Sequence, residues 1–289
     1  MNESLNMQEA LQVAEEAARQ GGQIIKDYFG KTMHITMKRG IEEQIPVDTE
    51  SEKAIISVLH DYFPDHRIQS EESGNRSGNS LYTWVIDPLD GTSNFILGIP
   101  QVAVCVTLVR ENDILLTVIH QPILDTFYTA ISGQGAYYVT TLDHGAYFNR
   151  ERLRVRQNAS SLSKSAICRV LSYGMHNHKQ ARDVMNRLYG KTRRLLDTWA
   201  PSLDWCMLAS GKVDGLVYVS THLLRYDPGM VAGLFLFREA GGFLGDLEYG
   251  ENIDNMAQVE SVIAATSDTL LKEIWRTIDE EVDDEACIR

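Results

Sequence analysis

Two aspartates three residues apart form the segment of this sequence that is best suited to chemistry. The letters WVIDPLDGTSNF occupy residues 84–95, so an apolar run ends at Asp87, Asp90 follows, and a glycine and two hydroxyl residues come next. Two carboxylates this close repel each other unless a cation lies between them, and hard divalent metals prefer oxygen ligands. Thr92 or Ser93 could cap a helix just beyond, and the backbone N–H groups at its start could bind a phosphate. The same letters also fit an ordinary polar turn, because Asp-Pro and Asp-Gly are frequent turn dipeptides.

Two further acidic positions suit the same chemistry. Glu71 and Glu72 follow a short strand predicted over residues 67–70, and Asp227 precedes Pro228 at the start of a strongly apolar helical pattern. Asp at the N-cap with Pro at the first helical position is also a preferred helix start. A capping carboxylate can still direct an oxygen at a metal, so the two interpretations of Asp227 are compatible.

The elements that position these residues follow from hydrophobic periodicity. Helices are predicted over residues 7–29, from Asp48 or Thr49 up to Pro64, over 178–189, 202–208 and 228–240, and after Ser267; strands are predicted over 67–70, 84–86, 102–109, 114–120, 126–130, 135–138, 165–170, 216–219 and 262–265. The first half therefore predicts two helices against a largely antiparallel sheet, and the second half alternates strands and helices. We predict an α+β layered sandwich that forms one unit over 1–289, with sub-halves of about 1–150 and 151–289.

Composition narrows the possible partners. The formal net charge is -13 and the pI is near 5.1, which argues against a nucleic-acid or anionic-membrane partner. Much of the excess lies in residues 279–285, which are predicted to form a solvated acidic tail. The four cysteines are scattered without CxxC spacing, as expected for reduced thiols. We see no signal peptide and no apolar run of about 18 residues, so we expect a cytoplasmic protein without a membrane span.

Taken together, the acidic segments resemble the inositol monophosphatase family, whose members are magnesium-dependent, lithium-sensitive phosphatases of small molecules. The family pattern has an acidic pair with serine, a D-P-[IL]-D-G-T segment, and an aspartate that opens a helix ending in E-A-G-G. Here these are residues 71–73, residues 87–92, and Asp227 with residues 239–242. The resemblance covers nearly the whole chain. It implies a layered α-β-α-β-α sandwich and a homodimer.

The resemblance also implies a role for each acidic residue. Glu71, Asp87 and the main-chain carbonyl of Leu89 would hold a first magnesium ion. Asp87 would bridge to a second ion, which Asp90 and Asp227 would also hold. A third, weaker ion would lie near Glu71. In such a site, two ions neutralise the phosphoryl oxygens of a monoester and activate the water that attacks in line.

The phosphate and the attacking water would be held by the segment after the aspartates. By resemblance, Gly91, Thr92 and Ser93 would offer backbone N–H groups to the phosphate. Thr92 paired with Asp48 would orient the attacking water and help to deprotonate it. Ile45 stands where the family has a threonine three residues before this aspartate, and an ordinary N-cap is the alternative role for Asp48.

The substrate side departs from the family pattern. Tyr226 stands where the family usually has tryptophan, and Ser220 stands where inositol phosphatases carry a glutamate that contacts sugar-like hydroxyls. Residues 199–202 read WAPS where the family has G-S-A-A, and this tryptophan would reshape the pocket wall. Ser220 and Asp227 are our candidate substrate contacts on this side, and Asp197 and Arg225 are further candidates.

Three hypotheses follow. The first is a phosphomonoesterase of a polyol or sugar phosphate, such as inositol monophosphate. The second keeps the chemistry but moves the substrate to fructose 1,6-bisphosphate, histidinol phosphate or a 3′-phosphonucleotide. The third is a non-catalytic binding protein on the same fold. Loss of a metal carboxylate would favour the third hypothesis, and none of the four is lost.

Overall fold

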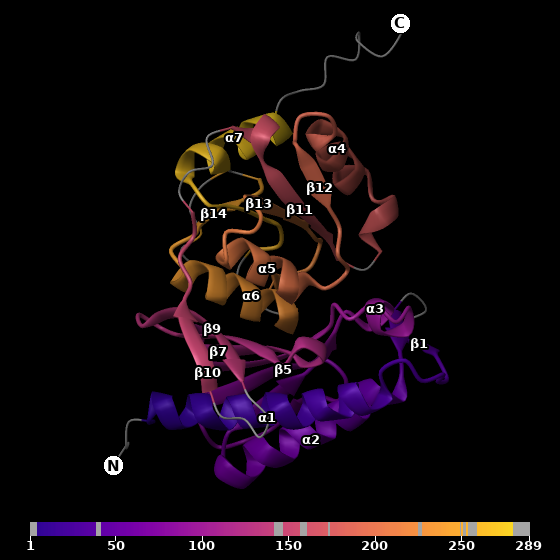
Figure 1. Ribbon diagram of the computed structural model, residues 1–289, viewed down its shortest axis with the longest axis vertical. Helices are drawn as coiled ribbons and strands as arrows, with labels where there is room; N and C mark the ends of the chain where they lie inside the picture. The colour runs from indigo at the N-terminus through magenta and orange to yellow at the C-terminus, as the bar shows by residue number, and fades with distance from the viewer. Residues whose placement is uncertain are drawn as a thin grey trace, which may run out of the picture.

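The computed structural model describes residues 5–38, 42–141, 147–156, 161–172, 174–224, 227–248, 250, 253 and 259–279. Within these residues, layers of helix, sheet, helix, sheet and helix follow one another from the bottom to the top of Figure 1. This order confirms the predicted α+β sandwich. The candidate positions Arg225 and Tyr226, and the predicted acidic tail beyond Asp279, lie outside the described residues. No helix in the described part of the chain is both long and apolar enough to span a membrane.

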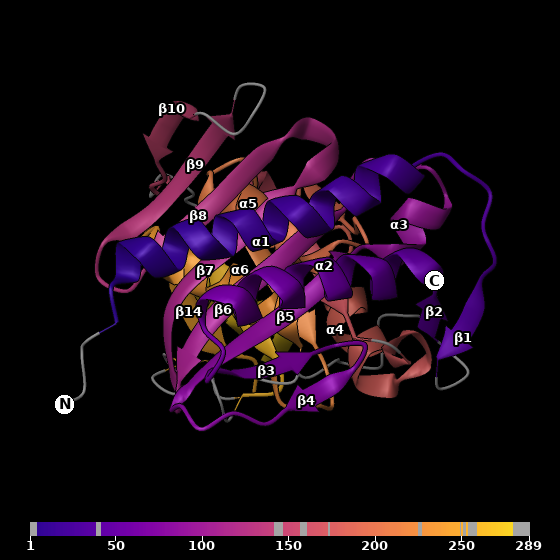
Figure 2. The ribbon, with the colours of Figure 1, turned by 90° about the horizontal axis from the view of Figure 1, so that it is seen from below.

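The first layer consists of two helices, α1 (Met7–Tyr28) and α2 (Pro46–Tyr62), which cover one face of the large sheet (Figure 2). The α1 helix begins at the N-cap Asn6, whose side chain accepts the N–H groups of Gln8 and Glu9. Our prediction that Asp48 or Thr49 opens α2 was wrong. Pro46 occupies the first helical position and Asp48 the third. Proline is favoured at the first position because its fixed φ already matches helical geometry.

The second layer is an eight-stranded sheet. Its strand order is β10 (Tyr147–Arg152), β9 (Gly135–Thr141), β8 (Thr126–Ile131), β7 (Asp113–Gln121), β6 (Ala103–Arg110), β5 (Tyr82–Asp90), β3 (Arg67–Ser70) and β4 (Gly74–Arg76). Among the described strands of this sheet, only β3 and β5 pair in parallel, which confirms the largely antiparallel prediction. A separate small ribbon pairs β1 (Thr36–Lys38) with β2 (Glu42–Gln44). The short helix α3 (Thr92–Ile96) follows β5.

The central strand is longer than the apolar run predicted. β5 continues through both aspartates to Asp90, whereas the sequence predicted its end at Ile86. Asp87 pairs with Cys105 and Asp90 with Ala103 on β6, so the strand bulges around Pro88. A proline is tolerated at a bulge because no ladder hydrogen bond is required from it there.

The other layers come from the second half of the chain. The second sheet has the order β12 (Arg194–Leu196), β11 (Ala166–Leu171), β13 (Gly215–Val219), β15 (Val262–Ala265) and β14 (Phe243–Asp246). Helices α5 (Pro201–Ala209) and α6 (Pro228–Glu239) lie between the two sheets, and α4 (Lys179–Leu188) and α7 (Asp268–Asp279) cover the outer face. Three 3-10 turns complete the described elements: Pro122–Leu124, Leu162–Lys164 and Met175–Asn177.

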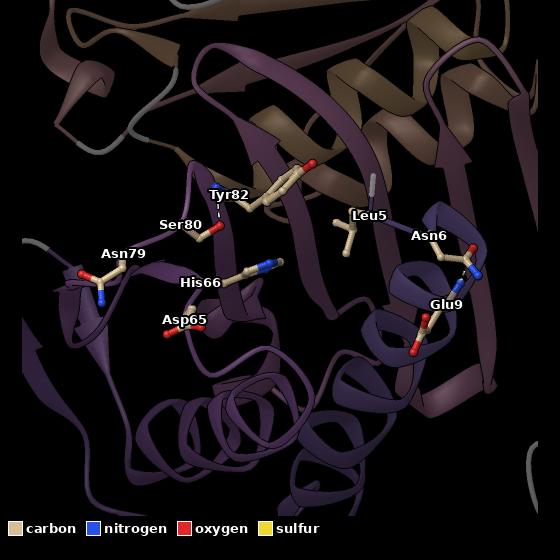
Figure 3. A pocket seen from close by; sticks show the side chains of 8 residues that line it. All are labelled: Leu5, Asn6, Glu9, Asp65, His66, Asn79, Ser80 and Tyr82. Carbon is tan, nitrogen blue, oxygen red and sulfur yellow. Dashed lines mark hydrogen bonds between the residues drawn. The ribbon is translucent and has the colours of Figure 1, made fainter. Parts of the chain in front are cut away.

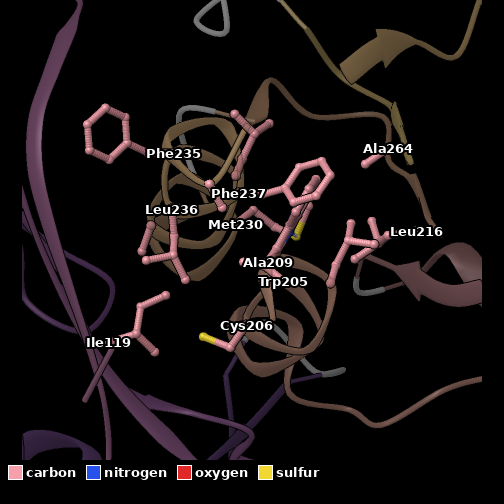
Figure 4. Packing of buried hydrophobic residues seen from close by; sticks show 14 of the residues in the cluster. Ile119, Trp205, Cys206, Ala209, Leu216, Met230, Phe235, Leu236, Phe237 and Ala264 are labelled. Carbon is pink, nitrogen blue, oxygen red and sulfur yellow. Dashed lines mark hydrogen bonds between the residues drawn. The ribbon is translucent and has the colours of Figure 1, made fainter. Parts of the chain in front are cut away.

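The middle layer is the core that holds the two halves together. Every residue of α6 from Pro228 to Phe237 is buried, because sheets lie on both sides of this helix. Trp205 of α5 packs against it, and the indole N–H meets the sulfur of Met230 at 3.3 Å (Figure 4). A side chain at Gly233 would collide with Trp205 at 2.4 Å, so glycine permits this contact. The packing fixes where the first turn of α6 lies.

Candidate active site

Acidic residues from both halves of the chain meet where β5 ends and α6 begins. Asp87 and Asp90 lie on the bulged end of β5, and both are buried. Asp227 is the N-cap of α6, and Glu71 follows β3. The two β5 aspartates and Glu71 come from the first half and Asp227 comes from the second, so the middle layer brings the two sets together.

The buried carboxylates of the cluster act on one another electrostatically. The pKa of Asp87 is raised well above its usual range, first by burial and then by the charges of Glu71, Asp90 and Asp227. Burial also raises the pKa of Asp90 to about 7, although two hydrogen bonds from Ser202 oppose the shift. Buried like charges of this kind are stable when protonated or when a cation lies among them.

The first turn of α6 contacts the two aspartates of β5. A Cβ placed on Gly229 would lie 3.1 Å from Asp87 Oδ2 and 3.6 Å from Asp90 Oδ1. Glycine therefore lets the helix start approach the carboxylates. Asp227 accepts the Met230 N–H at 3.0 Å and the Tyr218 hydroxyl donates to it at 3.4 Å. This confirms its role as an N-cap.

Hydrogen bonds fix the orientation of both β5 carboxylates. Asp87 Oδ1 accepts the Leu89 N–H at 3.1 Å. Asp90 Oδ2 accepts the Ser202 N–H at 2.9 Å and also the Ser202 hydroxyl. Sequence reasoning missed Ser202 as a site residue. Pro201 at the start of its helix was the local signal, because exposed N–H groups at a helix start suit a carboxylate.

Glu71 and Glu72 form hydrogen bonds with different partners. The Glu71 N–H donates to the Ile86 carbonyl at 3.2 Å, which fastens it to β5, and its charge acts on Asp87. The Glu72 carboxylate accepts the side-chain amide of Gln44. Glu71 is therefore the glutamate of the pair whose charge raises the pKa of Asp87.

One face of α2 holds the two acidic segments in place. Asp48, Ser51 and Glu52 are buried polar residues on this face. The Ser51 hydroxyl donates to the Pro88 carbonyl at 2.8 Å, and Glu52 accepts the Ser73 N–H at 2.9 Å. Sequence reasoning missed Ser51 and Glu52. Their spacing from Asp48 by three and four residues was the available signal, because such residues share a helix face.

The turn into α3 depends on a glycine. Gly91 has a φ of +88° and is the N-cap of α3, so the prediction of Thr92 or Ser93 as the cap was wrong. A Cβ on Gly91 would lie 2.9 Å from the Gln101 carbonyl oxygen. Glycine takes the cap position because it alone adopts this backbone freely and fits the space.

The predicted water-binding pair lies on separate elements. The Thr92 hydroxyl donates to the Leu89 carbonyl at 3.1 Å, and Asp48 Oδ2 accepts the Ile45 N–H at 2.8 Å. The Ser93 hydroxyl donates to the Glu43 carboxylate. The pairing of Thr92 with Asp48 stays a prediction.

The substrate-side candidate Ser220 is buried and already hydrogen-bonded. Its hydroxyl donates to the His222 carbonyl at 3.2 Å and accepts the His222 N–H at 3.0 Å. Asp197 forms an ion pair with Arg169 at 2.9 Å. The substrate contact at Ser220 stays a prediction.

The donor set suits magnesium, which prefers oxygen ligands. The available groups are the carboxylates of Glu71, Asp87, Asp90 and Asp227 and the carbonyl of Leu89. In the described part of the chain, no three acidic, histidine or cysteine side chains are already arranged around one metal position. The oxygens of Asp87, Asp90 and Asp227 point instead at N–H and O–H donors, which stabilise repelling carboxylates. The residues fit the ion by the chemistry of their donor atoms.

A cavity outside the carboxylate cluster has a different lining. A cavity of about 980 Å³ opens beside the start of β5, between Tyr82, His66 and the beginning of α1 (Figure 3). The His66 ring stacks on Phe63 and Tyr82, and burial lowers the pKa of His66. Of the described residues that line the cavity, none is a lysine or arginine, and two are the acidic Glu9 and Asp65. This lining does not suit a phosphate.

Comparison with known proteins places the chain among phosphatases. The model of the inositol monophosphatase family matches residues 6–283. The fructose-1,6-bisphosphatase/inositol-1-monophosphatase of Aquifex aeolicus is 31% identical over 82% of this chain and 85% of its own length. The Nus factor SuhB of Haemophilus influenzae is 32% identical over 94% of this chain and 96% of its own length. The crystal structure of the extragenic suppressor protein SuhB from Bartonella henselae superposes with a TM-score of 0.81 at 25% identity, covering 95% of this chain and all of that one.

Proposed function

Because the chain belongs to the inositol monophosphatase family, and is therefore a phosphoric monoester hydrolase, we propose that it hydrolyses a small phosphorylated metabolite with magnesium bound at the carboxylate cluster. Members of the family depend on metal, generally Mg²⁺. The observation behind the proposal is the mutual electrostatic effect of Glu71, Asp87, Asp90 and Asp227 in a buried setting. A cation would stabilise the ionised form of such a cluster, and it would also neutralise a phosphate monoester, which carries about two negative charges.

We propose two principal metal positions. Glu71, Asp87 and the Leu89 carbonyl would hold the first ion, and Asp87 would bridge to a second held by Asp90 and Asp227. A third, weaker ion would bind near Glu71. When bound, the ions would supply charge neutralisation for the phosphoryl oxygens and a lowered pKa for water.

Side chains and backbone N–H groups of the chain would bind the phosphate and position the attacking water. Gly91, Thr92 and Ser93 would direct backbone N–H groups of the α3 start at the phosphate. Thr92 and Asp48 would hold the attacking water and accept its proton. Ser202 keeps the Asp90 carboxylate in one orientation. Attack from the side opposite the leaving alcohol needs no covalent phosphoenzyme.

The first candidate substrate is inositol monophosphate or a similar polyol or sugar phosphate. Fructose 1,6-bisphosphate, histidinol phosphate and a 3′-phosphonucleotide are the alternatives. The Aquifex relative supports a shared chemistry, because its name joins a bisphosphatase and an inositol monophosphatase activity. Phosphate release from all four, with and without magnesium, tests the proposal. Magnesium-dependent release from one compound well above the others supports it, and no release from any of them contradicts it.

We propose further that residues 1–150 and 151–289 act as one unit, because the cluster takes Asp227 from the second part. A homodimer and inhibition by lithium are proposed from the family resemblance. Light scattering tests the dimer, because a dimer has twice the 32.5 kDa mass of the chain. Full activity in high lithium would contradict the proposed type of site.

A further inference from the structure

Trp199 is a large residue in a backbone conformation that glycine normally takes. Its φ is +58°, and its side chain is 52% exposed. Left-handed backbone is a genuine outlier for a bulky residue, and such outliers persist where the surrounding structure imposes them. The two other described non-glycine residues with positive φ, Glu111 and Asp125, lie in tight turns on the large sheet.

Both neighbours of Trp199 are fastened to the active site. On one side, Asn94 of α3 donates to the Thr198 carbonyl at 2.8 Å. On the other side, Ala200 is the N-cap of α5, and the Ser202 N–H and hydroxyl both donate to Asp90. The positive φ is therefore set by two anchors, one on α3 and one on the metal carboxylate.

The backbone of Trp199 lies against the proposed phosphate-binding turn. Its carbonyl oxygen is 3.4 Å from the position that a Cβ on Gly91 would take. An indole on this residue is thus within side-chain reach of an alcohol attached to a phosphate at the α3 start. About half of the surface of Trp199 (52%) stays exposed, although tryptophan is highly buried on average. The hydroxyl of Ser220 already donates its proton to the His222 carbonyl, so it has no second proton to donate to a polyol.

We propose that Trp199 determines substrate specificity by stacking its indole on a flat aromatic or heteroaromatic ring in the alcohol part of the phosphomonoester. This inference rests on the proposed function and narrows its substrate class. Aromatic pairs gain from offset or edge-to-face contact beyond the area that they bury. Among the candidate substrates, this favours alcohols with an imidazole or purine ring over inositol.

Two matched esters test the proposal. 2-Phenylethyl phosphate and ethyl phosphate have similar leaving alcohols and differ in the ring. In the magnesium-loaded wild type, we expect kcat/KM to be about tenfold higher for the phenylethyl ester, the size of effect that an aromatic contact supplies. Trp199→Leu should reduce this ratio to near one, chiefly through KM, and Trp199→Phe should keep most of it.

The variants separate stacking from packing. Leucine at position 199 keeps an apolar side chain and the positive φ, and phenylalanine keeps the ring. Tyr189→Leu, which removes an aromatic residue that is 63% exposed on the outer layer, should keep the wild-type ratio. An unchanged ratio in Trp199→Leu, or a wild-type ratio near one, overturns the inference. If the wild type releases no phosphate from these esters or from the four metabolites, the proposed function itself fails.

Discussion

Ser202 determines how the Asp90 carboxylate lies, because both of its hydrogen-bond donors reach the same oxygen. These bonds favour the ionised form of Asp90 and oppose the effect of burial on its pKa. The carboxylate is thereby held ionised and in one orientation, as the proposed metal site requires. Residues that orient a ligand in this way typically change metal affinity or activity about 10- to 100-fold when they are removed.

We therefore expect Ser202→Ala to lower kcat/KM by about 10- to 100-fold and to weaken magnesium binding. Steady-state phosphate release at several magnesium concentrations measures both effects. Ser210→Ala is the matched control, because Ser210 ends the same helix and its hydroxyl donates to the Cys206 carbonyl at 2.7 Å. Activity of Ser202→Ala within twofold of the control would contradict this role.

Gly229 gives a second test at a single position. Its replacement by alanine puts a Cβ 3.1 Å from Asp87 Oδ2, so the carboxylate or the helix must move. We expect the magnesium concentration for half-maximal activity to rise about tenfold, as it does when a ligand is displaced. Helix propensity favours alanine by up to about 1 kcal/mol, so urea unfolding should show little loss of stability. An unchanged magnesium requirement would show that α6 does not control the cluster.

At the scale of one element, α5 contains a buried acid that titrates near neutrality. Burial raises the pKa of Asp204 to about 7, while hydrogen bonds from Thr198 and Cys168 lower it. The Thr198 hydroxyl donates to this carboxylate at 2.7 Å, so the acid also holds the segment that leads to Trp199. Between the unfolded pKa of 3.8 and the folded pKa of about 7, the Asp204 carboxyl is protonated in the folded protein and ionised in the unfolded chain.

The difference between the folded and unfolded pKa of Asp204 makes the free energy of unfolding depend on pH. Because the folded pKa lies above the unfolded value of 3.8, the contribution is fully present below the unfolded pKa and is lost as pH rises through about 7. Asp204→Asn should remove it. From pH 5 to pH 8, the unfolding free energy of the wild type should fall by about 2–3 kcal/mol relative to that of the variant. Urea melts of both proteins at the two pH values measure this, and parallel pH profiles would contradict it.

At the scale of the whole molecule, the proposed metal site joins the two halves. Magnesium should bind the folded chain only, and at 100 times its dissociation constant it should stabilise the fold by about 2.7 kcal/mol. We expect a rise of several degrees in the melting temperature and one unfolding transition for both halves. Differential scanning calorimetry with and without magnesium measures both quantities. Separate transitions for the halves would contradict the single unit.

The sequence was sufficient where chemistry and pattern are local. The apolar runs of β6, β7 and β15 and the apolar helix α6 were predicted within two residues at each end, and the aspartates were found because their spacing is unusual. The strands β1, β2, β4, β10, β12 and β14 were missed, because each is short and takes its pairing from neighbours that periodicity does not reveal.

The supporting residues could not be predicted for a different reason. Ser202 meets Asp90 across 112 positions of sequence, and Gly229 matters through a carboxylate on another layer. Ser51 and Glu52 point into the protein from a helix whose polar residues would ordinarily face solvent. The local signals at Pro201 and along α2 indicate a helix start and a helix face, and the three-dimensional packing identifies the partner of each residue.

The most direct test of the carboxylate cluster is the magnesium-dependent phosphate release of Asp90→Asn beside the wild type. An amide at position 90 keeps the shape of the side chain and removes the charge proposed to bind the second ion. The account predicts that turnover falls to background at every magnesium concentration, with an unchanged circular dichroism spectrum. Turnover near that of the wild type, in a folded variant, would show that Asp90 is not part of the metal site.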